Sequence, residues 1–317
     1  MGNFPSYSSN IPYFWPKFEF SLILFGIILS IPCYLFVFYH ILMEKVSRQS
    51  LHNHVIFLLL VYNFIIVIFD LPMILNFNRL GYVSPFNPFI CLLWQYIDNG
   101  IWYGALSLMF WATFERHILV FNTNLVSTKY RRLFIHYIPL IFFSLYTPLV
   151  YFYLVFIYSC GQIFVTTAIR CGSICLYINT PQWLQLYDSY VHYTLPVLLI
   201  PICSVTLLSR FIKQKRRLQQ IVTWRQSRKM IIQITLVSTV YIVFDLPAII
   251  VFIVQSSGYP TFGNTIWSPF LTRMTLIPSI ILPFATLLAL PRFKEKLARL
   301  CFWKHNRRAV LPGTTTF

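Results

Sequence analysis

The sequence predicts an all-α membrane protein: a bundle of seven transmembrane helices followed by a short amphipathic eighth helix. The first observation is composition, because 57% of the 317 residues are hydrophobic and only 10% are charged, too few to cover the surface of a soluble domain. The second is that hydrophobic runs about 20 residues long, the length that crosses a bilayer, occur seven times. Such runs must be helical, since lipid offers their backbone groups no other partner.

The seven runs follow one another with short loops between them. They lie near residues 20–42, 53–77, 91–114, 133–157, 190–211, 230–255 and 268–290. The third and seventh are the least clean, because the third carries Asp98 and Asn99 and the seventh carries Arg273. The chain divides accordingly into an extracellular N-terminus (1–19), a seven-helix domain (20–290) and an amphipathic helix with a cytosolic tail (291–317).

The third observation is where the positive charge lies. The net charge is +17, but its placement argues against nucleic acid as a partner. All but four of the 25 Lys and Arg residues lie between the first two runs, just after the third, between the fifth and sixth, or after the seventh. The four on the opposite side are Lys17, Arg79, Arg170 and Arg273. The positive-inside rule therefore predicts an outer N-terminus and a cytosolic C-terminus, as in a multi-pass protein of the plasma membrane.

The third run ends in Glu115-Arg116-His117, where apolar sequence meets the cytosolic surface. Alone, this triplet reads as an interfacial anchor. Asp98, however, lies 18 residues before Arg116, a whole number of turns at about 100° per residue, so both lie on one face about 27 Å apart. An acid near the outside and an acid–base pair at the inside of one helix indicate a device that reads one side of a membrane and reports to the other.

These residues resemble the rhodopsin-like (class A) G-protein-coupled receptors, over nearly the whole chain. Glu115-Arg116-His117 matches that family's Asp/Glu-Arg-Tyr triplet, and Cys91 its third-helix cysteine. The other matches are Asn53 and Pro72 in the second helix, Pro196 in the fifth, Pro247 in the sixth, Pro283 in the seventh and Phe293 in the eighth. The resemblance implies a receptor, not an enzyme, that activates a heterotrimeric G protein through the triplet, Pro247 and Pro283.

The chain also departs from this family. Asn63 replaces the second-helix aspartate, so we expect no sodium ion in the bundle centre. No other motif indicates a metal or a cofactor. Many relatives restrain the triplet arginine with an acid at the cytosolic start of the sixth helix, where this chain has Ser227. The resemblance therefore implies appreciable signalling without ligand.

Two stretches share an unusual pattern, VIFDLPMIL at 67–75 and IVFDLPAII at 242–250. Asp70, Asp245 and Asp98 all fall in the outer half of the predicted bundle, where buried acids normally face a cavity or a partner. An alternative is structural. Each proline frees a backbone carbonyl one turn earlier, and a protonated aspartate could donate to that carbonyl.

The resemblance gives Asp98 the role of counter-ion for a cationic ligand, an amine or a peptide, bound from outside. Trp102 and Tyr241 would add cation–π contacts, and Asp70 and Asp245 would assist. The competing hypothesis is a transporter built as a 3 + 1 + 3 repeat, because the shared Asp-Leu-Pro pattern relates the second helix to the sixth. It would use Asp70, Asp98 and Asp245 in one central site.

The outer cysteines predict at least one disulfide. They are Cys91, Cys160, Cys171 and Cys175, which allow three pairings. The resemblance implies Cys91 with Cys175, or alternatively with Cys171. On the cytosolic side, residues 291–303 form an amphipathic pattern suited to lie on membrane lipids, and Cys301 is a candidate for lipidation.

Overall fold

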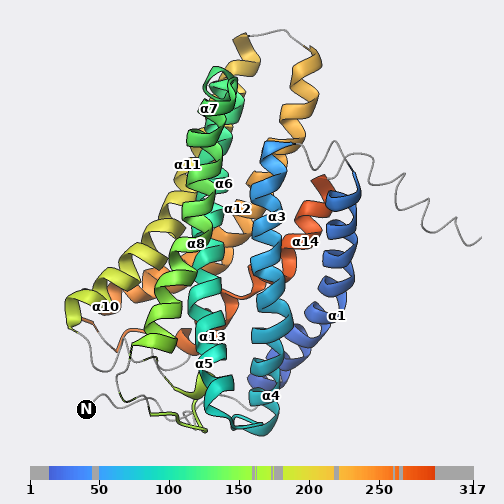
Figure 1. Cartoon of the computed structure of the whole chain (residues 1–317). Coiled ribbons are helices and arrows are strands. Elements are labelled where there is room, and N and C mark those ends of the chain that lie inside the picture. The colour runs from blue at the N-terminus through green and yellow to red at the C-terminus, as the bar shows by residue number, and fades with distance from the viewer. Residues whose placement is uncertain are drawn as a thin grey trace, which may run out of the picture.

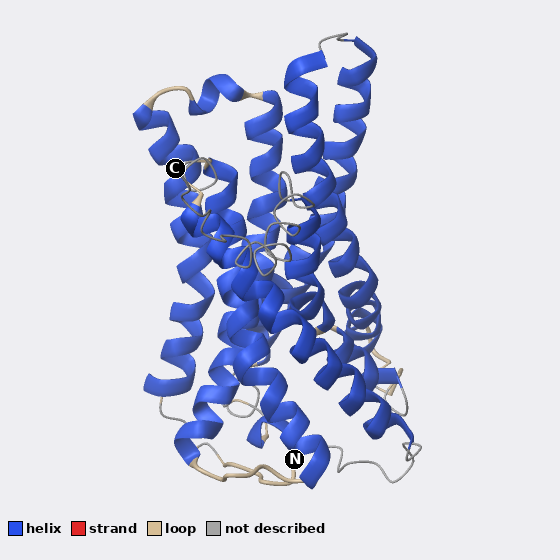
Figure 2. Ribbon diagram, turned by 90° about the vertical axis from the view of Figure 1, so that its right-hand side faces the viewer, coloured by secondary structure: helices blue, strands red, loops and turns tan. Residues whose placement is uncertain are grey.

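The structure is a computed structural model and describes residues 14–44, 50–158, 161, 163–172, 174, 181–217, 221–259, 261–263 and 267–289. Within these ranges the chain is helical except in its loops, and no strand is formed (Figure 2). The helices pack side by side into one elongated bundle (Figure 1). We name its ends after the orientation that the charges predict. The outer end is at the bottom of Figure 1 and the cytosolic end at the top.

The first four membrane helices are assembled from consecutive segments. The first is α1 (Phe14–Met43). The second comprises α3 (Leu51–Ile65), η1 (Ile66–Asp70) and α4 (Leu71–Leu80). The third comprises α5 (Pro88–Tyr96), η2 (Ile97–Ile101) and α6 (Trp102–Phe121). The fourth comprises α7 (Lys129–Arg132), η4 (Leu133–Tyr137), α8 (Ile138–Phe152) and η5 (Tyr153–Ile157).

Three further helices complete the bundle and confirm the predicted seven. The fifth comprises α10 (Gln182–Asp188), η7 (Ser189–Thr194) and α11 (Leu195–Arg217). The sixth is α12 (Ile221–Ser256), and the seventh comprises α13 (Trp267–Met274) and α14 (Ile277–Ala289). The fifth begins well before the predicted residue 190, because contacts with the fourth helix hold its polar first turns, and hydropathy does not register such contacts.

Among the described residues, five helices are long and apolar enough to cross a membrane. They span Lys17–Met43, Asn53–Leu80, Lys129–Ile157, Gln182–Lys213 and Ile234–Ser256. The third helix is not among them, and the seventh contributes the shorter apolar helix Ile277–Leu288. These are the two runs that the sequence marks as least clean. Both helices pack against other helices of the bundle. This is expected in a multi-pass bundle, where some helices face protein more than lipid.

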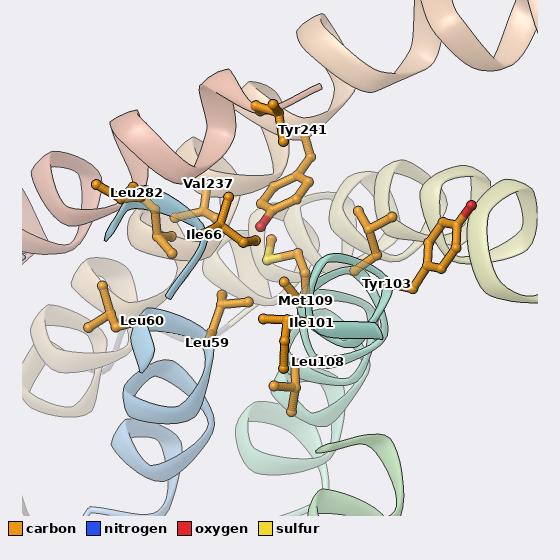
Figure 3. Close-up of a cluster of buried hydrophobic side chains, with 14 of the residues drawn as sticks. Leu59, Leu60, Ile66, Ile101, Tyr103, Leu108, Met109, Val237, Tyr241 and Leu282 are labelled. Atoms are coloured by element: carbon orange, nitrogen blue, oxygen red, sulfur yellow. The ribbon is translucent and has the colours of Figure 1, made fainter. Parts of the chain in front are cut away.

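An apolar cluster fills the centre of the bundle (Figure 3). Leu59 and Ile66 of the second helix, Met109 of the third, Tyr241 of the sixth and Leu282 of the seventh are each at most 3% exposed. The third helix packs against the second, fourth, fifth and sixth. A displacement of the third helix therefore reaches most of the bundle, because close-packed interiors transmit strain.

Two of the three outer-half acids lie in π-helical turns. Asp70 is the last residue of η1, and Asp98 is the second residue of η2, whereas Asp245 lies in the continuous helix α12. Such wide turns are rare and are found mostly at functional sites. Each turn inserts one residue, so it redirects the side chains that follow. The sequence carries no simple signal for these π-helical turns.

Candidate functional site

A cavity of about 330 Å³ opens in the outer half of the bundle. The third, fifth, sixth and seventh helices line it, together with the loop before the fifth helix. Its charged lining consists of Asp98 and Arg170, and aromatic side chains such as Trp102, Tyr193 and Phe252 supply much of the remaining wall. This mixture of apolar surface with a few polar groups is typical of a small-molecule site.

The two charges of the cavity face each other. Nη2 of Arg170 lies 2.8 Å from Oδ1 of Asp98, and the two side chains are 29% and 10% exposed. Charge-assisted contacts of this length are among the stronger hydrogen bonds in proteins. The sequence predicts Asp98 as the counter-ion of an external cation. In the structure, the protein itself supplies a cation to this carboxylate.

Arg170 is positioned by a tightly held loop. Its φ of 59° and the φ of 58° at Cys171 are in the left-handed region that side chains other than glycine rarely adopt. Nε2 of Gln95 donates to the carbonyl of Arg170 at 3.1 Å and to that of Gly172 at 3.4 Å. The backbone N–H of Val165 donates to the carbonyl of Cys171 at 3.0 Å. The loop is thus fastened to the third helix at Arg170 and just after it.

A disulfide joins the same loop to the start of the third helix. Cys91 pairs with Cys171, with 5.7 Å between their Cα atoms. The preference for Cys175 is therefore wrong, and the alternative partner is the one found. That preference came from the family resemblance, which takes no account of the early start of the fifth helix at Gln182. Cys160 and Cys175 lie outside the described residues.

Asp70 is buried beside the cavity rather than in its wall. It is 0% exposed, and its Oδ1 accepts a hydrogen bond from Nε1 of Trp94 at 2.7 Å. Its Oδ2 has no hydrogen-bond partner among the described residues. Burial alone would lower the pKa of the Arg170 guanidinium, but the carboxylates of Asp98 and Asp70 outweigh burial and raise that pKa above its ordinary value. Arg170 is therefore under the influence of two acids.

Asp245 has a different environment. It is 0% exposed, and neither of its carboxyl oxygens has a hydrogen-bond partner among the described residues. The alternative in which it donates to the carbonyl freed by Pro247 is therefore wrong, and Asp70 does not play that role either, since its bonded oxygen faces Trp94. Of the predicted ligand-binding residues, Asp98 and Trp102 line the cavity, whereas Asp70, Asp245 and Tyr241 do not.

No protein-family model matches the sequence, and no curated protein matches it either. Among solved structures, squid rhodopsin superposes with a TM-score of 0.67 over 96% of this chain and 91% of the squid protein, at 14% identity. The chain has the rhodopsin fold. At this identity the likeness shows the fold, and the functional argument depends on the residues of this chain.

At the cytosolic end of the rhodopsin-like bundle, Glu115 pairs with a residue that the sequence analysis did not select. Its carboxylate contacts Nδ1 of His136 in the fourth helix. Nε2 of His136 lies 3.3 Å from Nδ1 of His54 in the second helix. Arg116 is 1% exposed, and Nε2 of His117 lies 2.9 Å from the carbonyl of Cys203 in the fifth helix. The triplet is therefore connected to three neighbouring helices.

A second polar cluster, between the fourth and fifth helices, was also missed. The hydroxyl of Tyr151 donates to Oδ1 of Asp188 at 2.5 Å, and Nδ1 of His192 lies 2.7 Å from the same oxygen. Nε2 of His192 is 3.3 Å from the hydroxyl of Tyr146. Asp188 and His192 are four residues apart, the spacing of neighbours on one helix face, and that spacing was the available signal. This cluster holds the outer turns of the fifth helix.

Pro247 and Pro283, which the sequence predicts to take part in G-protein activation, lie inside α12 and α14. Cys301 and the predicted amphipathic helix at 291–303 lie outside the described residues, as do most of the predicted N-terminus and the predicted tail. The backbone of Ser227 belongs to α12, but its side chain is not among those that the structure describes.

Proposed function

We propose that this chain is a G-protein-coupled receptor of the plasma membrane, which binds an extracellular ligand in the outer cavity and activates a heterotrimeric G protein. One observation carries the proposal. The helix that runs from Pro88 to Phe121 holds Asp98 in the cavity wall and the buried Glu115 and Arg116 near its other end. One continuous helix thus joins a ligand-sized site to the predicted G-protein site.

The cavity favours a small cation, an amine or one end of a peptide. Its volume of about 330 Å³ is near the lower limit of typical ligand pockets. Asp98 supplies a carboxylate, and the aromatic wall at Trp102 and Tyr193 suits the apolar part of an amine and can add cation–π attraction. Membrane lipids surround the bundle, and we propose no role for nucleic acid.

The sixth helix offers the route from ligand to G protein. Ala248, Val251 and Phe252 line the cavity and follow Pro247 in α12. A ligand with higher affinity for one position of these residues shifts the equilibrium between two positions of the helix. Because α12 is continuous to Ile221, such a shift would move its cytosolic end. Receptors of this fold bind their G protein there.

The transporter hypothesis has less support. It needs Asp70, Asp98 and Asp245 around one site, and of these Asp98 alone lines the cavity. Uptake of a radiolabelled amine into sealed vesicles containing the purified chain would nevertheless favour it.

The test of the proposed function is nucleotide exchange on purified G proteins by the chain in lipid nanodiscs. We expect exchange above background without ligand, because Ser227 replaces a restraining acid, and a further rise with some members of a panel of amines and peptides. Arg116→Ala should reduce exchange to background, and Ser227→Glu should lower it severalfold. Arg79→Ala, which removes the same charge from the outer side, is the matched control and should leave exchange unchanged. Background exchange in the wild type with every G-protein class and every ligand would contradict the proposal.

A further inference from the structure

We propose that Arg170 is a resident cation of the ligand site, which a cationic ligand must replace at Asp98, and that Asp70 receives the displaced guanidinium. The biological meaning of this exchange rests on the proposed receptor function. Its ligand class is a single positive charge, ammonium or guanidinium, attached to a small apolar group.

The first step of the argument is that the Arg170–Asp98 contact is built into the loop. The left-handed backbone at Arg170 and Cys171, the disulfide to Cys91 and the two bonds from Gln95 all fix the start of the Arg170 side chain. Left-handed conformations of such residues persist only where their surroundings enforce them. A surface arginine that met Asp98 by chance would need none of these constraints.

The second step is charge balance. Asp98 and Asp70 are two acidic side chains, and among the described residues of the cavity wall Arg170 is the one cation. An external cation that takes Asp98 from Arg170 would leave a partly buried guanidinium without its ion-pair partner, which is unfavourable. Oδ2 of Asp70, buried and without a hydrogen-bond partner among the described residues, provides an acceptor for it. After the exchange, two cations face two carboxylates.

The third step is accessibility. The Arg170 side chain is 29% exposed, so it can leave Asp98 without opening the bundle, and its long side chain can change direction while its backbone stays anchored. An anionic ligand would instead compete with Asp98 for Arg170 and leave Asp98 beside Asp70 without compensation. The arrangement therefore selects cations over anions.

The exchange can be tested by chemical rescue. Arg170→Ala removes the atoms beyond Cβ, and ethylguanidinium has the size and charge of the missing group. We expect Arg170→Ala to lower the midpoint of thermal unfolding of the purified chain, and ethylguanidinium to raise it again by about 2–4 °C at ten times its Kd. Ethylurea, similar in shape but neutral, should not raise it. The wild type should respond to ethylguanidinium much less, because Arg170 holds the site.

Two variants assign the rescue to the proposed groups. In Arg170→Ala/Asp98→Asn the rescue by ethylguanidinium should disappear. Arg273→Ala breaks the contact between Arg273 and Glu19, a pair of the same kind elsewhere in the bundle, and any response of this control to ethylguanidinium should be unaffected by Asp98→Asn. Equal responses in Arg170→Ala and wild type, or a rescue that survives Asp98→Asn, would overturn the proposal.

The role of Asp70 is tested separately with Asp70→Asn. In the wild type, Asp70→Asn keeps an oxygen for the Trp94 bond but removes the charge that would receive Arg170. It should weaken the small response of the wild type to ethylguanidinium further, while leaving the rescue of Arg170→Ala within about twofold in apparent affinity. If Arg170→Ala does not fold, Arg170→Gly, which suits the left-handed backbone at this position, is measured in its place with propylguanidinium, which has the size of the whole missing side chain, and with the same expectations. A rescue by ethylguanidinium in a chain whose wild type shows background nucleotide exchange with every G-protein class and every ligand would uphold the cation site and reject the receptor function.

Discussion

The two Phe-Asp-Leu-Pro stretches have the same local sequence but different surroundings. Asp70 and Asp245 are both 0% exposed. Asp70 ends the π-helical turn η1 and accepts a hydrogen bond from the indole of Trp94. Asp245 lies within the uninterrupted helix α12, and its two oxygens have no hydrogen-bond partner among the described residues. The carboxyl of Asp70 is thus hydrogen-bonded to a neighbouring helix, whereas that of Asp245 has no such bond among the described residues.

This difference shows that the partner of a buried acid is chosen by packing rather than by its own sequence. In η1 the backbone N–H of Leu71 bonds to the carbonyl of Ile66, five residues back, which widens the helix just before Pro72. Such a turn changes the direction in which Asp70 points relative to a regular helix. The third helix then supplies an indole N–H at that place, whereas no described residue donates a hydrogen bond to Asp245.

The largest expected effect is a difference in the free energy of unfolding between Asp70→Ala and Asp245→Ala. Asp70→Ala leaves the buried N–H of Trp94 without its acceptor, which should lower the free energy of unfolding by about 1–3 kcal/mol. Asp245→Ala removes a buried carboxyl that has no hydrogen-bond partner among the described residues, so the free energy of unfolding should stay the same or increase. Reversible unfolding of both variants in the same lipid or detergent measures the difference. Equal losses in the two variants would show that the comparison is mistaken.

The features that depend on composition and local pattern could be predicted from the sequence. The seven helices, the weakness of the third and seventh as independent spans, and the burial of Asp70, Asp98 and Asp245 all follow from hydropathy and from the cost of an acid in lipid. The partners of these acids do not follow, because Arg170 lies 72 residues after Asp98 and meets it through a loop whose path depends on a disulfide.

The cytosolic end illustrates the same limit. The triplet Glu115-Arg116-His117 could be recognised from its position, but its contact with His136 depends on how the fourth helix packs against the third. His136 had no distinguishing neighbour in the sequence. Helix positions were predictable from one chain segment at a time, whereas contacts between helices required the assembled bundle.

A smaller effect tests whether Trp94 is the cause of the asymmetry. Trp94→Phe removes the N–H but keeps an aromatic ring, so it should destabilise the chain by less than Asp70→Ala does. In the double variant Trp94→Phe/Asp70→Ala the two losses should not add, with a coupling of about 1 kcal/mol. Trp94→Phe and Asp245→Ala should add within about 0.5 kcal/mol, because the two positions share no contact of this kind. Double-mutant cycles of unfolding provide both values, and additivity in the first cycle would exclude the Trp94–Asp70 bond as a source of stability.

The smallest expected effect concerns the two prolines. Pro72 lies in the first turn of α4, directly after η1, a position where helices tolerate a residue without an N–H. Pro247 lies inside α12, where the missing N–H removes an intrahelical bond to the carbonyl of Val243. Pro247→Ala can restore that bond and should raise the free energy of unfolding by about 0.5–1 kcal/mol, whereas Pro72→Ala should change it by less. Pro247→Ala should also reduce ligand-free nucleotide exchange, because the missing hydrogen bond at Pro247 is expected to let the helix flex between cavity and cytosol, and Pro72→Ala should leave exchange unchanged. A gain in stability at position 72 equal to that at 247 would mean that η1 does not accommodate its proline, and that the two stretches are more alike than their hydrogen bonds indicate.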